Sequence, residues 1–452
     1  MKKTVIFILL ILFAGFSVMG QQGNIKFTEF DLPNGLHVIM HQDHTTPNVF
    51  VSLMYHVGSK DEDPERTGFA HLFEHLMFEG SEHIDRGDYF KIVQSNGGEL
   101  NANTSFDRTY YYENMPSNQL ELALWMEAER MLHGKVDTTG VNTQKGVVIE
   151  ERKQVMENRP YGTFLDELGK RLFTVHPYRW FVIGYSEHIQ NSTFDDVYDF
   201  YRTYYVPNNC VLVIAGDFEE AKAKEWVHKY FADIPRGTKP IVRPTVVEPP
   251  MKSEVRDVIY DKIQLPGVFM AYRGPAMGMK DAYVIDLICS VLSGGKSARF
   301  KTNITDKGIA VESAAISMEF EHPGAIYVLA IANAGKTAEE IEDALNNEID
   351  KICHELVSED EFQMIKAAKE YEVASSMTSL STIAELLSNN YTYFKDTGRI
   401  NKQLENYSSI TREDIKDIAA KYFSKNNRVV LYYLPENLAS QPGNQEVQPS
   451  VN

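Results

Sequence analysis

The sequence predicts an α+β protein of two related domains, each a mainly antiparallel sheet packed with helices, facing each other across a cleft. Three observations lead to this prediction. The chain has 452 residues, too many for one compact core and suited to two domains of about 200 residues each. Strand-like and helix-like patterns alternate along it. A segment of the first half also recurs near the end of the second half.

The first half reads as strands followed by helices. Strands near 26–32 and 36–41 flank a Pro-Asn-Gly turn and predict a hairpin, and a third strand covers 48–57. Further strands are expected near 99–104, 108–115 and 210–215, and helices near 87–95, 117–133, 143–158 and 195–205. These elements form the predicted first domain, 25–234.

A proline-rich stretch, 235–252, predicts an extended linker because it carries almost no helical pattern. The second domain, 253–436, is expected to have the same kind of arrangement of strands and helices as the first, with strands within 255–272 and a helix at 281–292. Residues 437–452 are rich in Gln, Ser and Pro and predict a disordered tail.

The two halves read as an internal duplication. Several positions match at one constant offset: Thr193, Asp196, Val197, Tyr204, Asn208 and Asn209 correspond to Thr411, Asp414, Ile415, Tyr422, Asn426 and Asn427. A β-strand is predicted after each Asn-Asn pair. A constant offset over a segment of this length favours duplication over chance agreement.

Residues 1–20 predict a cleaved signal peptide. Lys2 and Lys3 precede an apolar run, and small residues before Gln21 suit a cleavage site. An uncleaved anchor is the alternative, but the run is short for a membrane span. The protein is therefore expected to be exported. The periplasm is the expected location, and the extracellular space is the alternative. No later apolar stretch is long enough to cross a membrane.

Charge and cysteine content exclude some classes of function. The formal net charge is −18 and becomes more negative without the signal peptide, which argues against nucleic acid as a partner. Cys210, Cys289 and Cys353 are an odd number in apolar contexts, so no disulfide framework is expected. Cys353 is read as a buried thiol beside an incidental His354 rather than as a ligand pair.

A His-x-x-Glu-His pattern organises the first domain. His71 and His75 are four residues apart on a predicted helix, so both project from one face and can hold one metal ion, usually zinc. Glu74 lies beside that face, where it can take a proton from a water activated by the metal. Chance occurrence of five residues is the competing interpretation.

The residues around this pattern resemble a known family. The run from Gly68 to Ser81 matches Gly-x-Ala-His-x-x-Glu-His-x-x-Phe-x-Gly-Ser/Thr, the pattern of the pitrilysin-type zinc peptidases, which include mitochondrial processing peptidase. The resemblance spans about Lys26 to Pro435. It implies one zinc per chain and hydrolysis of peptide bonds. The matching helix of the second half has Ile285, Ile288 and Cys289 at the three positions, so no metal is expected there.

A third ligand should come from a distant helix, because catalytic zinc usually has three protein ligands. The resemblance implies Glu151, the second acid of Val147-Val148-Ile149-Glu150-Glu151, and Glu150 is the alternative because adjacent helix residues point about 100° apart. Gln144 departs from the family pattern, which usually has a supporting Glu there. That departure bears on how residues around the metal ligands orient those ligands and adjust their affinity for the metal.

Substrate binding is expected on the short strand 99–104. It resembles the family's Asn-Ala-x-Thr strand, which binds a peptide as an added strand through backbone hydrogen bonds. Asn101 and Ala102 are therefore the candidate substrate-binding residues. The alternative for Asn101 is an asparagine that makes only local hydrogen bonds.

Two further departures bear on partners. Thr305 and Val311 stand where the family has an Arg and a Tyr that contact substrate across the cleft. The prediction is a heterodimer with a related subunit that supplies Arg and Tyr, with a homodimer as the alternative.

The sequence thus predicts an exported zinc metalloendopeptidase acting on peptides or unfolded polypeptides. A non-catalytic peptide-binding or scaffold subunit of a peptidase complex is the competing hypothesis. The presence of His71, Glu74, His75 and Glu151 argues against it, since a degenerate subunit would be expected to lose some of these.

Overall fold

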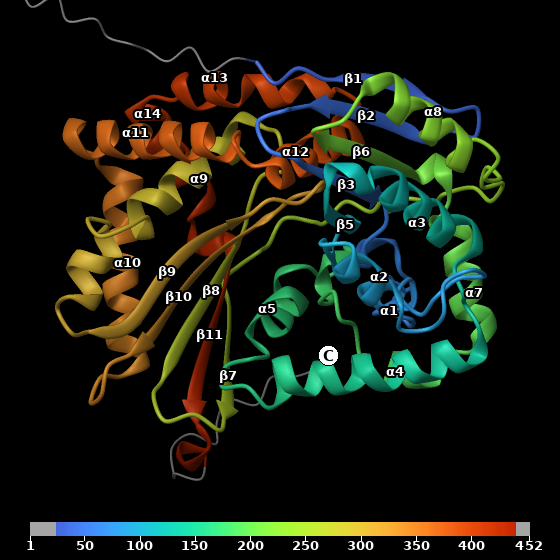
Figure 1. The fold of residues 1–452 in the computed structure, drawn as a ribbon. Helices are drawn as coiled ribbons and strands as arrows, with labels where there is room; N and C mark the ends of the chain where they lie inside the picture. The colour runs from blue at the N-terminus through green and yellow to red at the C-terminus, as the bar shows by residue number, and fades with distance from the viewer. Residues whose placement is uncertain (1–23, 440–452) are drawn as a thin grey trace, which may run out of the picture.

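Two β-sheets with their helices make up the computed structural model, which describes residues 24–439 (Figure 1). The first sheet has the strand order β1-β2-β6-β3-β5-β4. Its strands are β1 (Thr28–Asp31), β2 (His37–Gln42), β3 (Asn48–Tyr55), β4 (Glu99–Thr104), β5 (Thr109–Pro116) and β6 (Cys210–Gly216). The predicted N-terminal hairpin is present, with Asp31 opposite His37 across the turn.

The second sheet repeats this plan without a counterpart of β1. Its order is β7-β11-β8-β10-β9. Its strands are β7 (Val255–Asp261), β8 (Gly267–Arg273), β9 (Ala310–Met318), β10 (Ala325–Ala332) and β11 (Arg428–Pro435). One pair in each sheet is parallel, β2 with β6 and β7 with β11, and the other pairs are antiparallel. The prediction of two related, mainly antiparallel domains is confirmed.

Helices surround both sheets (Figure 1). Those of the first half are α1 (Phe69–Leu76), α2 (Tyr89–Ser95), α3 (Leu120–His133), α4 (Thr138–Arg152), α5 (Phe164–Leu172), α6 (Ser186–Asn191), α7 (Phe194–Tyr204) and α8 (Glu220–Phe231). Those of the second half are α9 (Lys280–Ser293), α10 (Ala338–His354), α11 (Glu359–Ser376), α12 (Leu380–Phe394), α13 (Gln403–Ser408) and α14 (Arg412–Tyr422).

The repeat is visible in the helix that precedes the last strand of each sheet. Helices α7 and α14 both begin with a capping box, in which a threonine and an aspartate exchange hydrogen bonds: Thr193 with Asp196, and Thr411 with Asp414. After each helix, the side chain of Asn209 or Asn427 donates to the carbonyl of the last helical residue at 2.8 Å. The matching residues in the sequence therefore play the same local roles in both halves.

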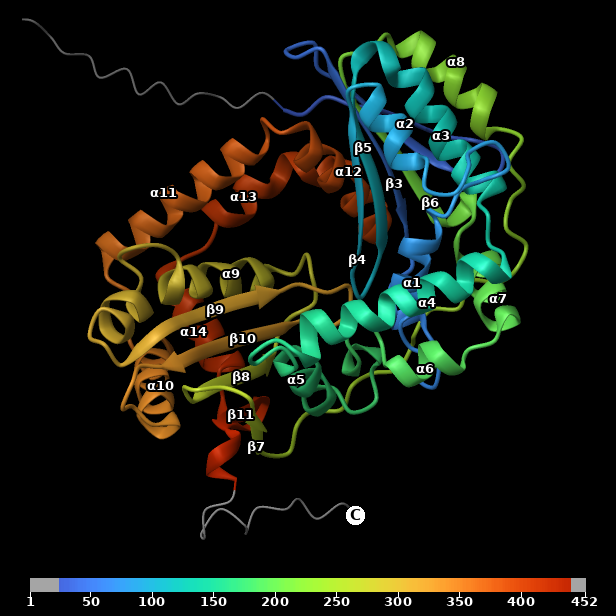
Figure 2. The same ribbon diagram turned by 60° about the horizontal axis from the view of Figure 1, so that its bottom comes forward.

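Each sheet buries its second face against a helix from the other half (Figures 1 and 2). Helix α12 packs on β3 and β6 of the first sheet, where Ile383 and Leu387 are buried. In the opposite direction, α5 packs on β8 and β11 of the second sheet, where Leu168 and Leu172 are buried. The halves thus share their hydrophobic cores, and their relative position is fixed by apolar burial.

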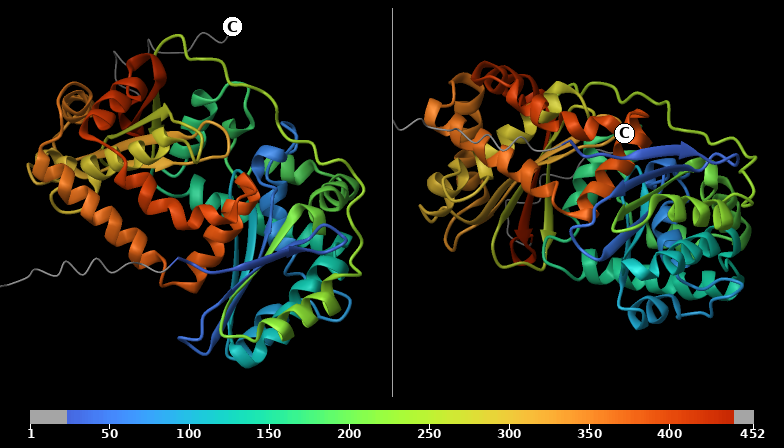
Figure 3. Two further views of the ribbon diagram at one scale, coloured as in Figure 1. Left: turned by 90° about the horizontal axis from the view of Figure 1, so that it is seen from above. Right: turned by 45° about the horizontal axis from the view of Figure 1, so that its top comes forward.

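The proline-rich stretch 235–252 contains no helix or strand and runs along the outside of the molecule (Figure 3). The domain bounds 25–234 and 253–436 stay predictions, because α5 and α12 pack across them. The signal peptide 1–20 lies outside the described residues, as does most of the tail 437–452, although Glu436–Leu438 forms a 3₁₀ turn. Within residues 24–439, no helix is long and apolar enough to cross a membrane.

Helix α4 begins at Thr138, earlier than the predicted start near residue 143. The Asp137 carboxylate caps it by accepting the Gly140 N–H at 2.7 Å. Threonine and glycine have low helix propensity, which hides the first turn from the sequence pattern. Beyond Arg152 the helix continues as a π-helical turn, Lys153–Glu157, so its predicted end near residue 158 agrees with the structure.

A buried charged cluster joins the two halves at the β9–β10 turn. Lys60 Nζ lies 2.9 Å from Asp107 Oδ1 and 2.6 Å from Glu321 Oε2, and the Lys60 side chain is fully buried. The backbone N–H of Glu321 donates to Asp107 Oδ2 at 3.0 Å. The Lys60 ammonium therefore compensates carboxylates from both halves.

Replacing Lys60 by Met should destabilise the protein by about 3–5 kcal/mol, because it leaves the buried Asp107 carboxylate without its cation. Equilibrium urea unfolding followed by circular dichroism measures this loss. Lys91→Met is the matched control, since Lys91 pairs with Asp88 on the surface and should leave the free energy of unfolding almost unchanged. Similar values for the two variants would contradict the prediction.

Candidate metal centre

Helix α1 presents two imidazoles from one face, about one turn apart. Leu72, Phe73 and Leu76 are buried in the core of the first half, which fixes the rotation of the helix. His71 and His75 therefore project together toward α4, with ring centroids 4.9 Å apart.

The start of α1 is held by a buried carboxylate. Glu62 accepts the backbone N–H groups of Gly68 and Ala70, both at 2.8 Å, and so satisfies donors that have no partner within the helix. Gly68 has φ of 92°, and a Cβ there would lie 2.6 Å from the Ile183 carbonyl oxygen. The glycine that opens the motif is thus required by the backbone conformation and by the close approach of another chain segment.

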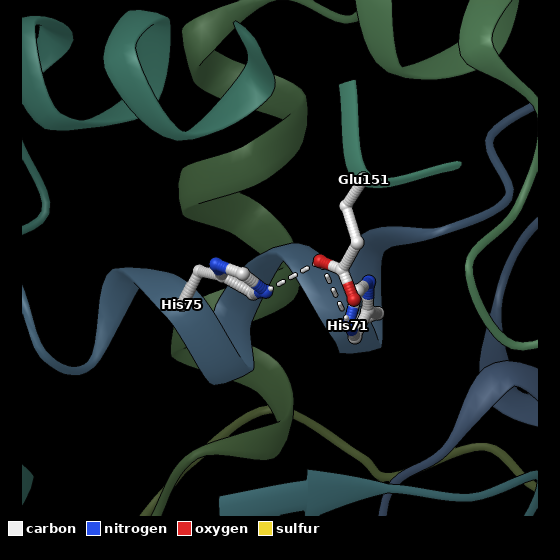
Figure 4. A group of neighbouring side chains, drawn as sticks. All are labelled: His71, His75 and Glu151. Atoms are coloured by element: carbon white, nitrogen blue, oxygen red, sulfur yellow. Dashed lines mark ion pairs between the residues drawn. The ribbon is translucent and has the colours of Figure 1, made fainter. Parts of the chain in front are cut away.

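Helix α4 brings Glu151 to the two histidines (Figure 4). Its Oε2 lies 3.3 Å from His75 Nε2 and 3.8 Å from His71 Nε2. Ligand atoms around a tetrahedral zinc are about 3.3 Å apart, because the bonds are about 2.0–2.1 Å long. Glu150, the alternative acid, points to solvent and pairs with Lys153.

The three side chains differ in their electrostatics. Burial, and next the charge of His75, lower the pKa of His71 to about 4, so this ring is neutral as a ligand must be. Burial also lowers the pKa of His75, but its hydrogen bond and charge interaction with Glu151 outweigh burial and raise it. The hydrogen bond from His75 lowers the pKa of Glu151, which is therefore a carboxylate. Among the described residues, only this group of three has the spacing of a metal site.

Glu74 lies on the same helix and is held by β4. Thr104 Oγ1 donates a 2.6 Å hydrogen bond to Glu74 Oε2. Burial raises the pKa of Glu74, against the opposing effect of that hydrogen bond. A carboxylate with a raised pKa is a better proton acceptor near neutral pH than an ordinary glutamate.

Gln144 lies on α4 two turns before Glu151 and contacts the segment that follows α1. Its Nε2 donates to Glu79 Oε1 at 2.5 Å, and Arg86 Nε lies 2.5 Å from Glu79 Oε2. Gln144 also raises the pKa of His75, with a smaller effect than Glu151. The residue at the position where the sequence departs from the family pattern thus binds a second carboxylate, that of Glu79.

The candidate substrate strand, β4, is an edge strand paired with β5. Leu100 and Ala102 point toward the core, whereas the Asn101 side chain is exposed. Asn101 Oδ1 accepts the N–H of Ala102 at 2.9 Å. In this state Asn101 makes the local hydrogen bond expected of the alternative interpretation, so its contact with substrate stays a prediction.

A cavity of about 690 Å³ begins at the end of β4 and lies between the two halves. Thr104 and Arg108 line it from the first half, and Phe320 and Tyr407 from the second. Thr305 and Val311, the positions where the family has its Arg and Tyr donors, are not among the residues that line this cavity. Thr305 is hydrogen-bonded to Ser313, and Val311 is 49% exposed on β9.

Some residues of the site carried no predicted role. Thr104 lies on the same face of β4 as Leu100 and Ala102, so the strand period could have placed it toward α1. Glu79 and Arg86 gave no such signal, because an acidic and a basic residue in a loop are usually solvated.

Two sequence models of one family match the chain. The model described as Insulinase (Peptidase family M16) matches residues 37–178, which include the His-x-x-Glu-His motif and Glu151. The model described as Peptidase M16 inactive domain matches residues 191–369, most of them in the second half.

Individual proteins agree with this assignment. Zinc protease PqqE of Helicobacter pylori is 27% identical over 425 residues, covering 93% of this chain and 96% of that protein. A probable mitochondrial-processing peptidase subunit beta of Arabidopsis thaliana is 24% identical, covering 73% of this chain and 64% of that protein. The crystal structure of a protease from Helicobacter pylori superposes with a TM-score of 0.87 at 27% identity, covering 91% of this chain and all of that one. The chain belongs to peptidase family M16.

Proposed function

We propose that this chain is an exported zinc metalloendopeptidase that hydrolyses peptides or unfolded polypeptides held as an added strand between its halves. The observation that carries the proposal is the convergence of His71, His75 and Glu151 beside Glu74. Two imidazoles and a carboxylate form a known ligand set of catalytic zinc, and an acid next to them is what hydrolysis requires.

The chain's own groups account for the proton transfers. Zinc held by the three side chains supplies a Lewis acid that lowers the pKa of water to about 7 and polarises a carbonyl. Glu74 takes the proton of the attacking water and delivers it to the leaving amine. Thr104 occupies Glu74 Oε2 at 2.6 Å, which leaves Oε1 for this exchange and fixes the carboxylate in position.

The open edge of β4 supports binding of an extended peptide. Among the described strands β4 pairs only with β5, so a substrate strand can add to its other side. Such binding uses backbone groups and tolerates varied sequences. A docked strand would take the Ala102 N–H now bonded to Asn101, and the released Asn101 amide could then bond the substrate backbone.

Export is part of the proposal and rests on residues 1–20. Two lysines followed by an apolar run are typical of a secretory signal, and the periplasm is the first expectation.

The first prediction from this proposal concerns the metal. The purified chain should hold about one zinc, and Glu151→Ala should weaken zinc binding by more than about 100-fold, since even an outer-shell partner costs 10–100-fold. Glu150→Ala is the matched control and should keep zinc, because Glu150 faces solvent. Chelator competition measures both affinities. Zinc kept in Glu151→Ala and lost in Glu150→Ala would mean that Glu150 is the ligand.

A second prediction separates the proton acceptor from the ligands. Glu74→Gln should keep zinc and lower kcat by about 100- to 10,000-fold, because an amide cannot accept the proton. Zinc content and cleavage of a peptide library are measured on the same preparation. A variant that cleaves at the wild-type rate removes Glu74 from the reaction. If the wild type cleaves nothing, alone or with a partner, the non-catalytic peptide-binding or scaffold subunit becomes the better description.

The proposal also includes a partner subunit. Negative charge builds on the carbonyl oxygen during hydrolysis, and a positioned donor typically contributes a hundredfold or more. Thr305 is engaged with Ser313, and Val311 has no donor. A related subunit that carries Arg and Tyr and lacks the metal motif would supply the missing donors in a heterodimer. A homodimer, or another donor within this chain, is the alternative.

The third prediction tests that dependence. The isolated chain should have a low kcat/KM on a peptide panel, rising at least tenfold when a companion subunit, ideally one encoded beside it, is added. The double substitution Thr305→Arg, Val311→Tyr should raise the activity of the isolated chain if missing donors are the cause. Equal activity with and without the companion, from a monomeric chain, contradicts the prediction.

A further inference from the structure

The turn between β9 and β10, residues 319–324, docks on the first half at the border of the cavity. Two of its backbone N–H groups hold it there. Glu321 donates to Asp107 Oδ2 at 3.0 Å, and His322 donates to the hydroxyl of Tyr178 at 3.1 Å. The position of this turn therefore affects the width of the cavity. Residues from both sides of the contact line it: Phe106, Asp107, Glu319 and Phe320.

Tyr178 is the residue of the first half at the centre of this contact. Its hydroxyl donates to Asp107 Oδ1 at 2.6 Å and accepts the N–H of His322. The residue is only 2% exposed, so water does not replace either hydrogen bond while the turn is docked. Tyr178 belongs to the 3₁₀ turn Pro177–Arg179. The placement of that 3₁₀ turn therefore decides whether the hydroxyl reaches both partners.

The ring of His176 caps this 3₁₀ turn. Its Nδ1 accepts the backbone N–H of Tyr178 at 3.2 Å, so the hydrogen of the neutral ring is on Nε2. His176 is 1% exposed, and within residues 24–439 its Nε2 has no hydrogen-bond partner. An imidazolium donates from both nitrogens. A proton added at Nδ1 would point at the Tyr178 N–H, which is itself a donor, and the cap would be lost.

The surroundings of His176 make a positive charge there unfavourable. The ring of His322 packs against it, with ring centroids 5.0 Å apart, so each half contributes one imidazole. Burial, and next the charge of His322, lower the pKa of His176 to about 4. Glu248, which accepts the backbone N–H of His176 at 2.8 Å, is already paired with Arg273. The other charged groups that act on the ring are Lys60, which lowers its pKa, and Asp107 and Glu248, which raise it.

A second histidine lies at the same contact, but its protonation breaks no hydrogen bond. His56 Nε2 lies 2.8 Å from Glu321 Oε2. Burial lowers the pKa of His56, although the hydrogen bond to Glu321 opposes this. The ring can donate that hydrogen bond with or without a second proton, because Nε2 carries a hydrogen in both forms. Lys60 also pairs with the same Glu321 oxygen. The geometry therefore singles out His176 as the histidine whose charge disrupts the contact.

We propose that His176 is an acid-sensitive switch in the contact between the two halves: its protonation undoes the cap of the 3₁₀ turn, withdraws the Tyr178 hydroxyl from turn 319–324 and widens the cavity. A ring released into water regains its ordinary pKa of about 6.5. The docked form is therefore fully favoured above about pH 6.5 and is progressively disfavoured as the pH falls from 6.5 toward 4. The switch does not depend on the metal site, although its use in admitting substrate rests on the proposed function.

Hydrogen–deuterium exchange of the purified chain, corrected for the intrinsic effect of pH on exchange, measures the contact. The backbone N–H groups of Glu321 and His322 should lose at least about tenfold in protection between pH 7.5 and pH 5. The reason is that a pKa of about 4 in the docked form and about 6.5 in the released form shifts the equilibrium by roughly 30-fold at pH 5.

His176→Asn is the test variant, because asparagine can cap the 3₁₀ turn and cannot take up a proton. Its protection of the same N–H groups should change less than about twofold between the two pH values. His354→Asn replaces an exposed histidine at the end of α10 and is the matched control, which should behave as the wild type does.

Thermal unfolding of each variant at both pH values verifies folding. Hydrogen exchange at the imidazole C2 position of the wild type, read by mass spectrometry, gives the pKa of His176 without any substitution. A His176 pKa near 6.5, or protection in the wild type that is unchanged between pH 7.5 and pH 5, overturns the switch. An equal loss of protection in a folded His176→Asn variant overturns it as well, because another group would then carry the pH dependence.

Discussion

The contact between α1 and α4 is the constraint on which the site depends. It places a carboxylate beside two imidazoles in a partly buried position, and such a grouping costs free energy unless opposite charges or a metal compensate it. The apolar face of α1, with Leu72 and Leu76 almost fully buried, holds that helix in place. Asp137 and Arg86 hold the start of α4. Burial elsewhere in the first half thus maintains a polar arrangement that would not form by itself.

Local spacing predicts part of this site, and tertiary packing decides the rest. His71, Glu74 and His75 lie within five residues of one helix, so helical geometry alone puts them on neighbouring positions. The place of Glu151 comes from a resemblance, because periodicity cannot say which helix packs on which. For the same reason the sequence does not reveal that α5 and α12 each pack on the sheet of the other half. An amphipathic pattern shows that a helix face is buried, but not against which sheet. The strands are well predicted because their alternation and turn residues are local signals.

The second half shows the same scaffold without the cluster of polar side chains on its helix. Ile285, Ile288 and Cys289 stand in α9 where α1 has His71, Glu74 and His75, and all three are buried. Each apolar side chain buried there contributes about 1.5–3 kcal/mol, whereas the polar counterparts in α1 require compensation. The first half therefore gives up stability at its site, and shared cores with the second half offset that loss.

The shared cores also limit how a substrate can enter. Separating the halves would expose the apolar surfaces that α12 and α5 bury on the two sheets, so the cavity between the halves cannot open by simple dissociation. A space of about 690 Å³ is the size of a pocket for a small ligand and admits a few residues of a chain, not a folded domain. In the proposed function, an extended segment is what such a cavity would admit, and an extended segment is also what the open edge of β4 could bind. If the proposed function holds, the packing that joins the two halves would favour peptides and unfolded polypeptides over folded proteins as substrates.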